Sequence, residues 1–470
     1  IRDGLTDEGF IAEHTEEYET FAASVADCTP EWAAEITGVA AADIEQAARS
    51  IGKAKRGAVY YTMGITQHSC GTDNVFAIAN LVLLTGNIGK YAAGLNPLRG
   101  QNNVQGASDM ACNPAMLPGY QRVDDAIARG RFEELWNCKL SDKPGLTATE
   151  MTGAMLDGKI AGLWIMGENP VLSDPNMSHL KKALEKLEFL VVQDIFLTET
   201  AELADVVLPA TCFAEKEGTF TNTERRVQRV RRAVHPPGEA RDDLSIINMI
   251  SNRMGYGHTI APDHLSCGVY RPGRGGGYGA APPYPAEVFA EISRAWPALA
   301  GISYERLEKE GIQWPCPDAT HPGTPYLFKD GFPRGKGRFT AVKFSGPKEL
   351  PDAEYPFVLT TGRVLHQYHT GTMTRRSKAL EEADRGPFVE MNPEDAKALG
   401  LTDGERVRAR SRRGRIELPV QVTSRVSRGV VFIPFHYREA AANLLTNDAL
   451  DPVCKIPEAK VCAVSIEACQ

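Results

Sequence analysis

The sequence predicts an α/β fold in which Rossmann-like, parallel-sheet domains are followed by a C-terminal β-barrel. Short apolar strands alternate with helical segments between residues 161 and 208, which is typical of a parallel sheet. From about residue 345 onward, β-rich segments separated by glycine and serine predict a small barrel. The 470 residues are too many for one ordinary core. We therefore expect roughly two to four domains.

The N-terminal part is predicted to be rich in helices. Apolar positions recur at helical spacing in residues 30–36 and 41–48, and again in residues 73–86. Residues 57–62 predict a buried strand. Residues 94–106 show no periodicity and are dense in glycine, asparagine and glutamine, so we expect a loop. Because such a loop buries little apolar surface, its presence indicates a functional role.

The middle of the chain contains three apolar strands, at residues 161–166, 189–192 and 205–208, with a helix at about residues 179–187. In a parallel sheet, ligands bind at the carboxyl ends of the strands. We therefore expect binding groups among the polar residues that follow each strand.

Four segments define the predicted barrel: residues 357–361, 406–411, 414–422 and 429–434. Each is rich in residues that favour strands, and turn residues separate them. Ahead of the barrel, residues 257–285 are rich in glycine and proline, which predicts a surface insertion.

Composition excludes several classes of protein. The net charge of −8 argues against a nucleic-acid partner, so an anionic ligand would need local donors. No apolar run reaches the roughly 18 residues of a membrane span. The first residues do not form a signal peptide. The ten cysteines include no C-x-x-C pair, which argues against an iron–sulfur cluster bound by this chain alone.

The strongest candidate site lies between Arg99 and Gly106. The planar guanidinium of Arg99 can bind a carboxylate through two parallel hydrogen bonds. The amides of Gln101 and Gln105 can both donate and accept, and Gly100 lets the backbone approach a ligand closely. On composition alone, a structural hydrogen-bonded loop is an equally good interpretation.

Further candidates follow the predicted strands. The carboxylates of Glu168 and Asp194 could accept hydrogen bonds from a guanine or a ribose. Nearby, Glu199 is also explained as part of a helix cap. Gln67 could hydrogen-bond a planar ligand, whereas the lone His68 is more often structural.

Hydroxyls, glycines and arginines gather in residues 361–363 and 369–377. Side chains and backbone N–H groups of this kind suit phosphate binding. The lysine and hydroxyl signature of a P-loop is missing, so the segment is not a P-loop.

Together these segments resemble the bis(molybdopterin guanine dinucleotide) oxidoreductases, and within them the formate dehydrogenases. The run Leu98-Arg-Gly-Gln-Asn-Asn-Val-Gln-Gly106 is the most specific part of the resemblance. The resemblance covers nearly the whole chain apart from residues 257–285. It implies that the barrel is a double-psi β-barrel.

The resemblance also implies a domain organisation. Residues 1–101 would belong to an α/β pterin-binding domain, and residues 102–212 would form the α/β domain that binds guanine dinucleotide. Residues 213–344 would form a small mixed domain, and residues 345–470 the barrel that closes over the cofactor.

Residue roles are carried over only at matching positions. Arg99 would be catalytic and would hold the formate carboxylate beside the metal. The pterins would be lined by Gln67, Gly100, Gln101 and Gln105. One guanosine half would be held by Gly167, Glu168, Asn169, Gln193, Asp194 and Asp243. The other cofactor would be held by Arg363, His369, Thr370, Thr374, Asn443 and Lys460.

The implied reaction is the oxidation of formate to CO₂, or its reverse, at molybdenum or tungsten. A [4Fe–4S] cluster and the cysteine or selenocysteine that binds the metal are expected in an N-terminal region outside these residues. Cys70 and Cys212 lie in the wrong sequence contexts to replace that ligand, so no metal ligand is expected in this chain. Electrons would pass to a partner subunit with iron–sulfur clusters or flavin, in the cytoplasm.

Three alternatives remain. Another enzyme with the same cofactor, such as a nitrate reductase, would carry a different sequence at Arg99. A non-catalytic scaffold or cofactor-binding fragment would fit the expected lack of a metal ligand. A nicotinamide-dependent dehydrogenase lacks support, because no G-x-G-x-x-G follows a strand.

Overall fold

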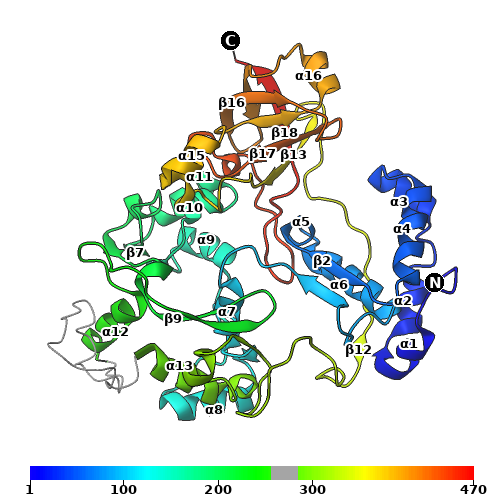
Figure 1. Ribbon diagram of the computed structural model, residues 1–470. Coiled ribbons are helices and arrows are strands. Elements are labelled where there is room, and N and C mark those ends of the chain that lie inside the picture. Colours follow the sequence, from blue (N-terminus) through cyan, green and yellow to red (C-terminus); the bar gives the residue numbers. More distant parts are fainter. Residues whose placement is uncertain (256–283, 470) are drawn as a thin grey trace. The chain divides into compact units, whose positions relative to one another are not determined.

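The computed structural model describes residues 1–255 and 284–469, and the chain divides into two compact units (Figure 1). The first unit consists of residues Ile1–Gly100, Thr324–Lys348 and Ala449–Glu458. The second consists of residues Gln101–Gly323, Glu349–Asp448 and Ala459–Gln470. The insertion predicted at residues 257–285 falls almost entirely outside the described residues.

The first unit is mainly helical, as predicted. Its helices are α1 (Glu8–His14), α2 (Tyr18–Ser24), α3 (Pro30–Thr37), α4 (Ala41–Lys53), α5 (Met63–Thr66) and α6 (Gly71–Leu84). Its strands are β1 (Thr15–Glu16), β2 (Ala58–Tyr61), β3 (Gly94–Pro97) and β12 (Gly337–Arg338). Local chemistry sets the bounds of α3. The side chain of Thr29 caps the first turn, and Gly38, with a φ of 72°, ends the helix.

Two expectations for residues 57–106 are wrong in detail. Strand β2 was expected to be buried, but among the described residues it pairs with β3 alone, and Tyr60 is 65% exposed. The loop expected over residues 94–106 is shorter, because β3 takes its first residues into a parallel ladder. The last residues of the expected loop belong to helix α7 (Val104–Asp109), which begins after Asn103, a residue in the left-handed conformation.

The second unit contains the predicted parallel sheet. Strands β6 (Gly162–Met166), β7 (Phe189–Asp194) and β8 (Val206–Pro209) lie in the order β6-β7-β8, and both pairings are parallel. Helices α9 (Ala148–Leu156), α10 (Pro170–Ser173) and α11 (Met177–Leu184) accompany them. Apolar residues of β7 pack with those of α9 and α11 in one core, which confirms the expected alternation of strand and helix.

Smaller elements complete the non-barrel part of this unit. The helices are α8 (Ala126–Trp136), α12 (Asp243–Arg253), α13 (Tyr284–Ala295) and α14 (Tyr304–Leu307). The strands are β4 (Met116–Leu117), β5 (Gln121–Arg122), β9 (Gly218–Thr221), β10 (Arg226–Val230) and β11 (Ile312–Gln313). Strand β10 lies between β9 and β11, and its Val227 packs against Trp296 and Leu307 in a second core.

The C-terminal barrel is closed and has the strand order β13-β17-β14-β16-β15-β18. Its strands are β13 (Phe357–Gly362), β14 (Val389–Met391), β15 (Arg406–Arg410), β16 (Arg415–Val422), β17 (Val430–Pro434) and β18 (Cys462–Ala468). Helices α15 (Lys378–Ala383) and α16 (Pro393–Leu399) connect strands. Side chains alternate inward along β16, where Leu418 is fully buried. The closed barrel and the parallel sheet confirm the predicted fold class.

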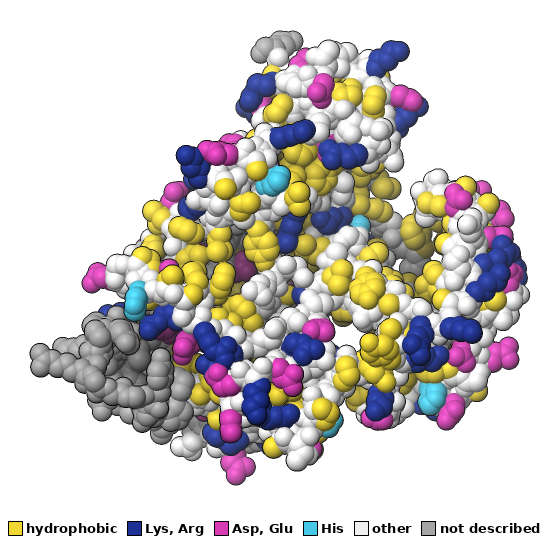
Figure 2. All heavy atoms as spheres, in the orientation of Figure 1, with side chains coloured by type: hydrophobic (Ala, Val, Ile, Leu, Met, Phe, Trp, Pro, Cys, Tyr) yellow, Lys and Arg dark blue, Asp and Glu magenta, His cyan; other side chains and the backbone are white. Residues whose placement is uncertain are grey.

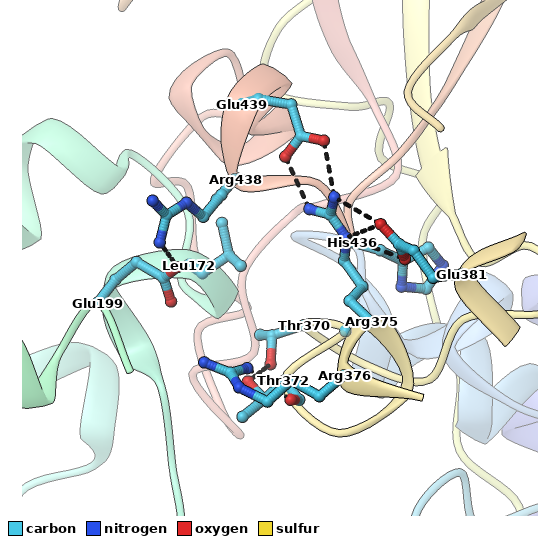
Figure 3. A pocket seen from close by; sticks show the side chains of 11 residues that line it. Leu172, Glu199, Thr370, Thr372, Arg375, Arg376, Glu381, His436, Arg438 and Glu439 are labelled. Atoms are coloured by element: carbon cyan, nitrogen blue, oxygen red, sulfur yellow. Dashed lines mark hydrogen bonds and ion pairs between the residues drawn. The ribbon is translucent and has the colours of Figure 1, made fainter. Parts of the chain in front are cut away.

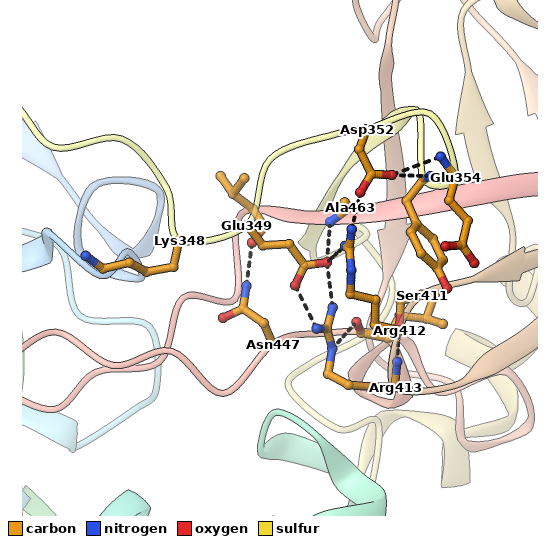
Figure 4. A network of polar contacts seen from close by, with 12 residues as sticks. Lys348, Glu349, Asp352, Glu354, Ser411, Arg412, Arg413, Asn447 and Ala463 are labelled. Carbon is orange, nitrogen blue, oxygen red and sulfur yellow. Dashed lines mark hydrogen bonds and ion pairs between the residues drawn. The ribbon is translucent and has the colours of Figure 1, made fainter.

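An ion-pair network connects the segment that precedes the barrel with the barrel itself (Figure 4). Glu349 forms salt bridges with Arg412 at 2.9 Å and Arg413 at 2.7 Å, and it accepts a hydrogen bond from the backbone of Ala463. Burial alone would raise the pKa of Glu349, but the two arginines lower it below its usual value. The carboxylate therefore stays charged and stabilises the barrel.

Candidate functional site

Carboxylates converge at the carboxyl ends of strands β6 and β7. Gly167, with a φ of 63°, turns the chain after β6, and its N–H bonds to the carbonyl of Gln193 at 2.8 Å. Glu168 is exposed as a residue, but its carboxyl group is partly shielded from water by the surrounding protein, and this shielding raises the pKa of Glu168. The negative charges of Asp174 and Asp194 raise it further. Burial also raises the pKa of Asp194. Such a group of acceptors suits a ligand rich in N–H and O–H donors.

A further carboxylate is held beside this strand end by two contacts. Asp243 accepts a hydrogen bond from the Gln193 amide at 2.7 Å and forms an ion pair with Lys216. Gln193 is fully buried, and its Oε1 has no partner among the described residues. Sequence reasoning missed Lys216, because nothing in its own surroundings in the sequence indicates this contact.

The side-chain amides of two predicted site residues form hydrogen bonds to other groups of the protein. The amide of Asn169 donates to Glu199 at 2.7 Å and accepts from the hydroxyl of Thr200 at 2.8 Å. The amide of Asn443 donates to the carbonyls of Leu172 and Ser173, at 2.9 Å each. Both side chains therefore support the site structurally, and their contact with a ligand stays a prediction.

A half-buried positive region follows strand β13. The guanidinium of Arg363 lies over the rings of Tyr368 and Phe435, at 5.6 Å and 5.9 Å, and its Nε is buried without a partner among the described residues. Burial and the charge of Arg363 lower the pKa of Lys460 to about 8. Lys460 donates to the carbonyl of Thr361 at 2.6 Å. Within the described ranges, neither cation has a salt bridge to a carboxylate.

The neighbouring histidine is neutral. Burial and the charge of Arg363 lower the pKa of His369 to about 4. His436 is also buried and lies between the carbonyl of His369 and the N–H of Val364, which accounts for a neutral ring that donates from Nδ1 and accepts at Nε2. The positive charge of this region therefore comes from Arg363 and Lys460. Two half-buried cations without carboxylate salt bridges in the described part of the chain fit the phosphates of an anionic ligand.

A cavity of about 350 Å³ lies next to these groups (Figure 3). Its cations are largely balanced: Arg375 pairs with Glu381 and Glu439, and Arg438 pairs with Glu199. The hydroxyls of Thr370 and Thr372, which line the cavity, lie 2.9 Å apart. By contrast, the hydroxyl of the nearby Thr374 donates to Gln367 and accepts from the backbone of Tyr368, so the protein itself uses it fully.

The remaining predicted residues are divided between the two units. Gln67, Arg99 and Gly100 belong to the first unit, and Gln101 belongs to the second. Arg99 is exposed after β3, near Tyr61. Burial raises the pKa of Tyr61, and the charge of Arg99 opposes that shift.

Gln105 belongs to the second unit and is only 7% exposed. Its amide nitrogen donates to Asp109 at 2.7 Å and to Tyr120 at 2.9 Å.

The described part of the chain contains neither a metal-binding cluster of side chains nor a membrane-spanning helix. No group of three or more His, Cys, Asp or Glu side chains there is arranged to hold a metal ion. None of the helices described is long and apolar enough to cross a membrane. On the face shown in Figure 2, acidic and basic side chains are intermixed. The charge of an anionic ligand would therefore be met by local groups such as Arg363 and Lys460.

The chain belongs to the molybdopterin oxidoreductase family. Residues 30–253 match the molybdopterin oxidoreductase family itself, and residues 357–463 match the molydopterin dinucleotide binding domain. The second match contains both Arg363 and Lys460. The carboxylates of Glu168 and Asp194, which can accept hydrogen bonds, fit the nucleoside part of such a dinucleotide cofactor, and the half-buried cations fit its phosphates.

Among similar proteins, formate dehydrogenases are prominent. The chain is 49% identical to the F420-dependent formate dehydrogenase subunit alpha of Methanocaldococcus jannaschii, over 99% of this chain and 66% of the relative. It is 38% identical to formate dehydrogenase H of Escherichia coli, over 99% of this chain and 63% of that protein. An assimilatory nitrate reductase catalytic subunit of Bacillus subtilis is 37% identical, over 99% of this chain and 64% of that protein.

A solved structure supports the fold. Acetylene hydratase from Pelobacter acetylenicus superimposes with a TM-score of 0.72, covering 100% of this chain and 68% of that chain. At 18% identity, this similarity concerns the fold alone. It agrees with the parallel sheet and closed barrel described above.

Proposed function

We propose that this chain is part of the catalytic subunit of a formate dehydrogenase, which oxidises formate to CO₂ or catalyses the reverse reaction. The observation that carries the proposal is Arg99, whose exposed guanidinium follows strand β3 in the segment Arg99–Gly106. Its planar fork matches a carboxylate with two parallel hydrogen bonds. Arg99 would bind and orient the formate anion, so that positioning and electrostatics lower the barrier.

The cofactor would be bis(molybdopterin guanine dinucleotide) with molybdenum or tungsten. When bound, it supplies the redox chemistry that protein side chains cannot perform. Arg363 and Lys460 would neutralise phosphate charge, since both are half-buried cations without carboxylate salt bridges among the described residues. Glu168 and Asp194 would accept hydrogen bonds from a guanosine. Pterin contacts would come from the amides and backbone of Gln67, Gly100, Gln101 and Gln105.

The remaining parts of the proposal concern partners and organisation. A [4Fe–4S] cluster would take electrons from the cofactor and pass them to a subunit with iron–sulfur clusters or flavin. The enzyme would act in the cytoplasm. We also retain the division into residues 1–101, 102–212, 213–344 and 345–470 as the functional domains.

Steady-state kinetics of Arg99→Ala in the holoenzyme test the proposed role. We expect kcat/KM for formate-dependent dye reduction to fall by about 10³-fold, because a charge-assisted bidentate contact is lost. The lysine variant Arg99→Lys keeps the charge but not the fork, and should recover only part of the activity. Arg56→Ala removes another exposed arginine of the same unit and serves as the matched control.

Metal and pterin contents must be measured in every variant. Wild-type formate activity in an Arg99→Ala protein with full cofactor content would refute the role of Arg99. The similarity to a nitrate reductase supports a second candidate function. Nitrate-dependent dye oxidation by the wild-type enzyme, without formate activity, would favour that function instead.

A further inference from the structure

His436 is a buried polar residue to which the proposed function gives no role. It follows strand β17, and its side chain is fully buried. Its ring joins two points of one loop: Nδ1 donates to the carbonyl of His369, and Nε2 accepts from the backbone N–H of Val364 at 3.0 Å. The ring also lines the cavity shown in Figure 3. All of these residues belong to the second unit.

Both nitrogens of the His436 ring are occupied by the protein. A carbonyl oxygen can only accept and a backbone N–H can only donate, so the ring must be neutral with its proton on Nδ1. Burial favours this neutral form, because it lowers the pKa of His436 below its usual value. The ring therefore has no hydrogen bond to offer a ligand, and its effect on a ligand must pass through the loop.

The loop of residues 364–369 has candidate cofactor-binding groups at both ends. Arg363 precedes its first residue, and the Nε of this half-buried side chain has no partner among the described residues. Thr370 follows its last residue. The hydroxyls of Thr370 and Thr372 lie 2.9 Å apart, and both residues line the cavity. A phosphate can accept hydrogen bonds from the arginine and from a hydroxyl at once when the loop holds both in place.

The ends of the loop need outside support to keep their conformation. His369 has a φ of 50° and Gly371 a φ of 73°, a region that favours glycine. A Cβ at Gly371 would lie 3.1 Å from the backbone oxygen of His436, so this segment packs directly against His436. The middle of the loop is anchored separately, since the amide of Gln367 donates to Asp384 at 2.8 Å. Loss of the His436 ring should therefore free the ends of the loop without unfolding it.

We propose that His436 is a positioning residue that fixes both ends of this loop, so that Arg363 and Thr370 meet the phosphates of the cofactor together. The inference rests on the proposed function, since it takes Arg363 and Thr370 as residues that hold the cofactor. His436 acts through these two residues and forms no hydrogen bond of its own with the phosphates. Replacement of His436 should therefore weaken cofactor retention more than it weakens the fold.

The test compares pterin release from the holoenzyme of His436→Phe and of a matched control. Phenylalanine keeps a buried ring but removes both hydrogen bonds. We expect released pterin, measured by its fluorescence, to appear about tenfold faster than from wild type. The control is His321→Phe, because the ring of His321 also accepts a backbone N–H, from Gly323 at 3.0 Å, but does not line the cavity. It should lower Tm and leave the release rate unchanged.

Two further measurements show whether His436 acts through the phosphate contacts. Added salt should speed release from wild type, because it screens the attraction between the phosphates and Arg363, and this dependence should be weaker in His436→Phe. Arg363→Met should speed release on its own. Adding His436→Phe to Arg363→Met should change the rate further by about threefold at most, because one of the two positioned groups is already gone.

Chemical rescue keeps the test decisive if His436→Phe does not fold. In His436→Ala, added imidazole can both donate and accept, as the native ring does, and it should slow pterin release. N-Methylimidazole can only accept a hydrogen bond and should not slow it.

Three outcomes would overturn the inference. In the first, His436→Phe retains pterin as well as wild type does. In the second, the effects of His436→Phe and Arg363→Met on the release rate multiply in full and the salt dependence stays as steep as in wild type, which is a merely structural effect. In the third, imidazole and N-methylimidazole act alike on His436→Ala. Native wild-type protein that contains no pterin would instead overturn the proposed function, and the inference with it.

Discussion

Replacement of Lys460 by methionine should stabilise the cofactor-free barrel. Burial and the charge of Arg363 lower the pKa of Lys460 to about 8, whereas an unfolded chain would have a value of about 10.4. This difference disfavours the folded state by about 3 kcal/mol whenever Lys460 is charged. Loss of the Lys460 hydrogen bond to Thr361 offsets about 1 kcal/mol of the gain. The net stabilisation in Lys460→Met is therefore about 2 kcal/mol at pH 7.

The effect has a defined pH dependence. Between pH 8 and about 10.4, the unfolded state binds more protons than the folded state, so wild-type stability rises with pH. The advantage of Lys460→Met is therefore fully present below pH 8 and disappears as pH rises through this window. In the holoenzyme the wild type should be more stable than Lys460→Met, because the variant lacks a cation for the cofactor phosphates.

Alkylation of Cys462 provides the assay. Its thiol lies in β18, is fully buried and reacts only when the barrel opens. In moderate urea at pH 7, mass spectrometry should show Cys462 of Lys460→Met reacting about 30-fold more slowly than that of wild type. Lys397→Met changes an exposed lysine on α16 and should have no effect. Equal or faster labelling of Lys460→Met at pH 7 would refute the reasoning.

Three further changes test other parts of the structure. Glu349→Gln should cost the barrel about 2 kcal/mol through the loss of its pairing with Arg413, measured by hydrogen exchange of β18. Wild type should lose this contribution as pH falls below about 4.3, because the folded pKa is lowered, and the variant should not. Asp451, whose pKa is about 2, accepts hydrogen bonds from four N–H and O–H groups. Allowing for solvent screening, Asp451→Asn should destabilise the first unit by about 1 kcal/mol in urea titrations above pH 4. Gly119→Ala should lower Tm by several degrees in calorimetry, because the new Cβ would clash with the Trp296 ring; an unchanged Tm would contradict the packing described.

Much of the fold could be predicted because hydrophobic patterns are local. Strands β6, β7 and β8 are apolar runs that end at glycine, at polar residues and at proline, respectively, and β16 alternates between buried and less buried positions. Strand β14 was missed, because its three residues are all buried and show no alternation. Strand β18 was also missed, since its small residues and Ser465 give a weak strand pattern.

The site was predicted less completely, for a different reason. The residues after strand ends could be found from their place in the sequence, as Glu168 and Asp194 were. Site residues whose role depends on contacts with distant parts of the sequence could not be found in this way. Lys216 meets Asp243 across 27 positions, and His436 meets His369 across 67. Such pairs become visible only when the fold brings them together.

The most direct test of the central claim is the metal and pterin content of the purified native protein. We predict one molybdenum or tungsten ion and two pterin guanine dinucleotides for each copy of this chain. Release of stoichiometric GMP on acid hydrolysis would identify the guanine nucleotides. Protein that is folded by circular dichroism but contains neither metal nor pterin would contradict the account.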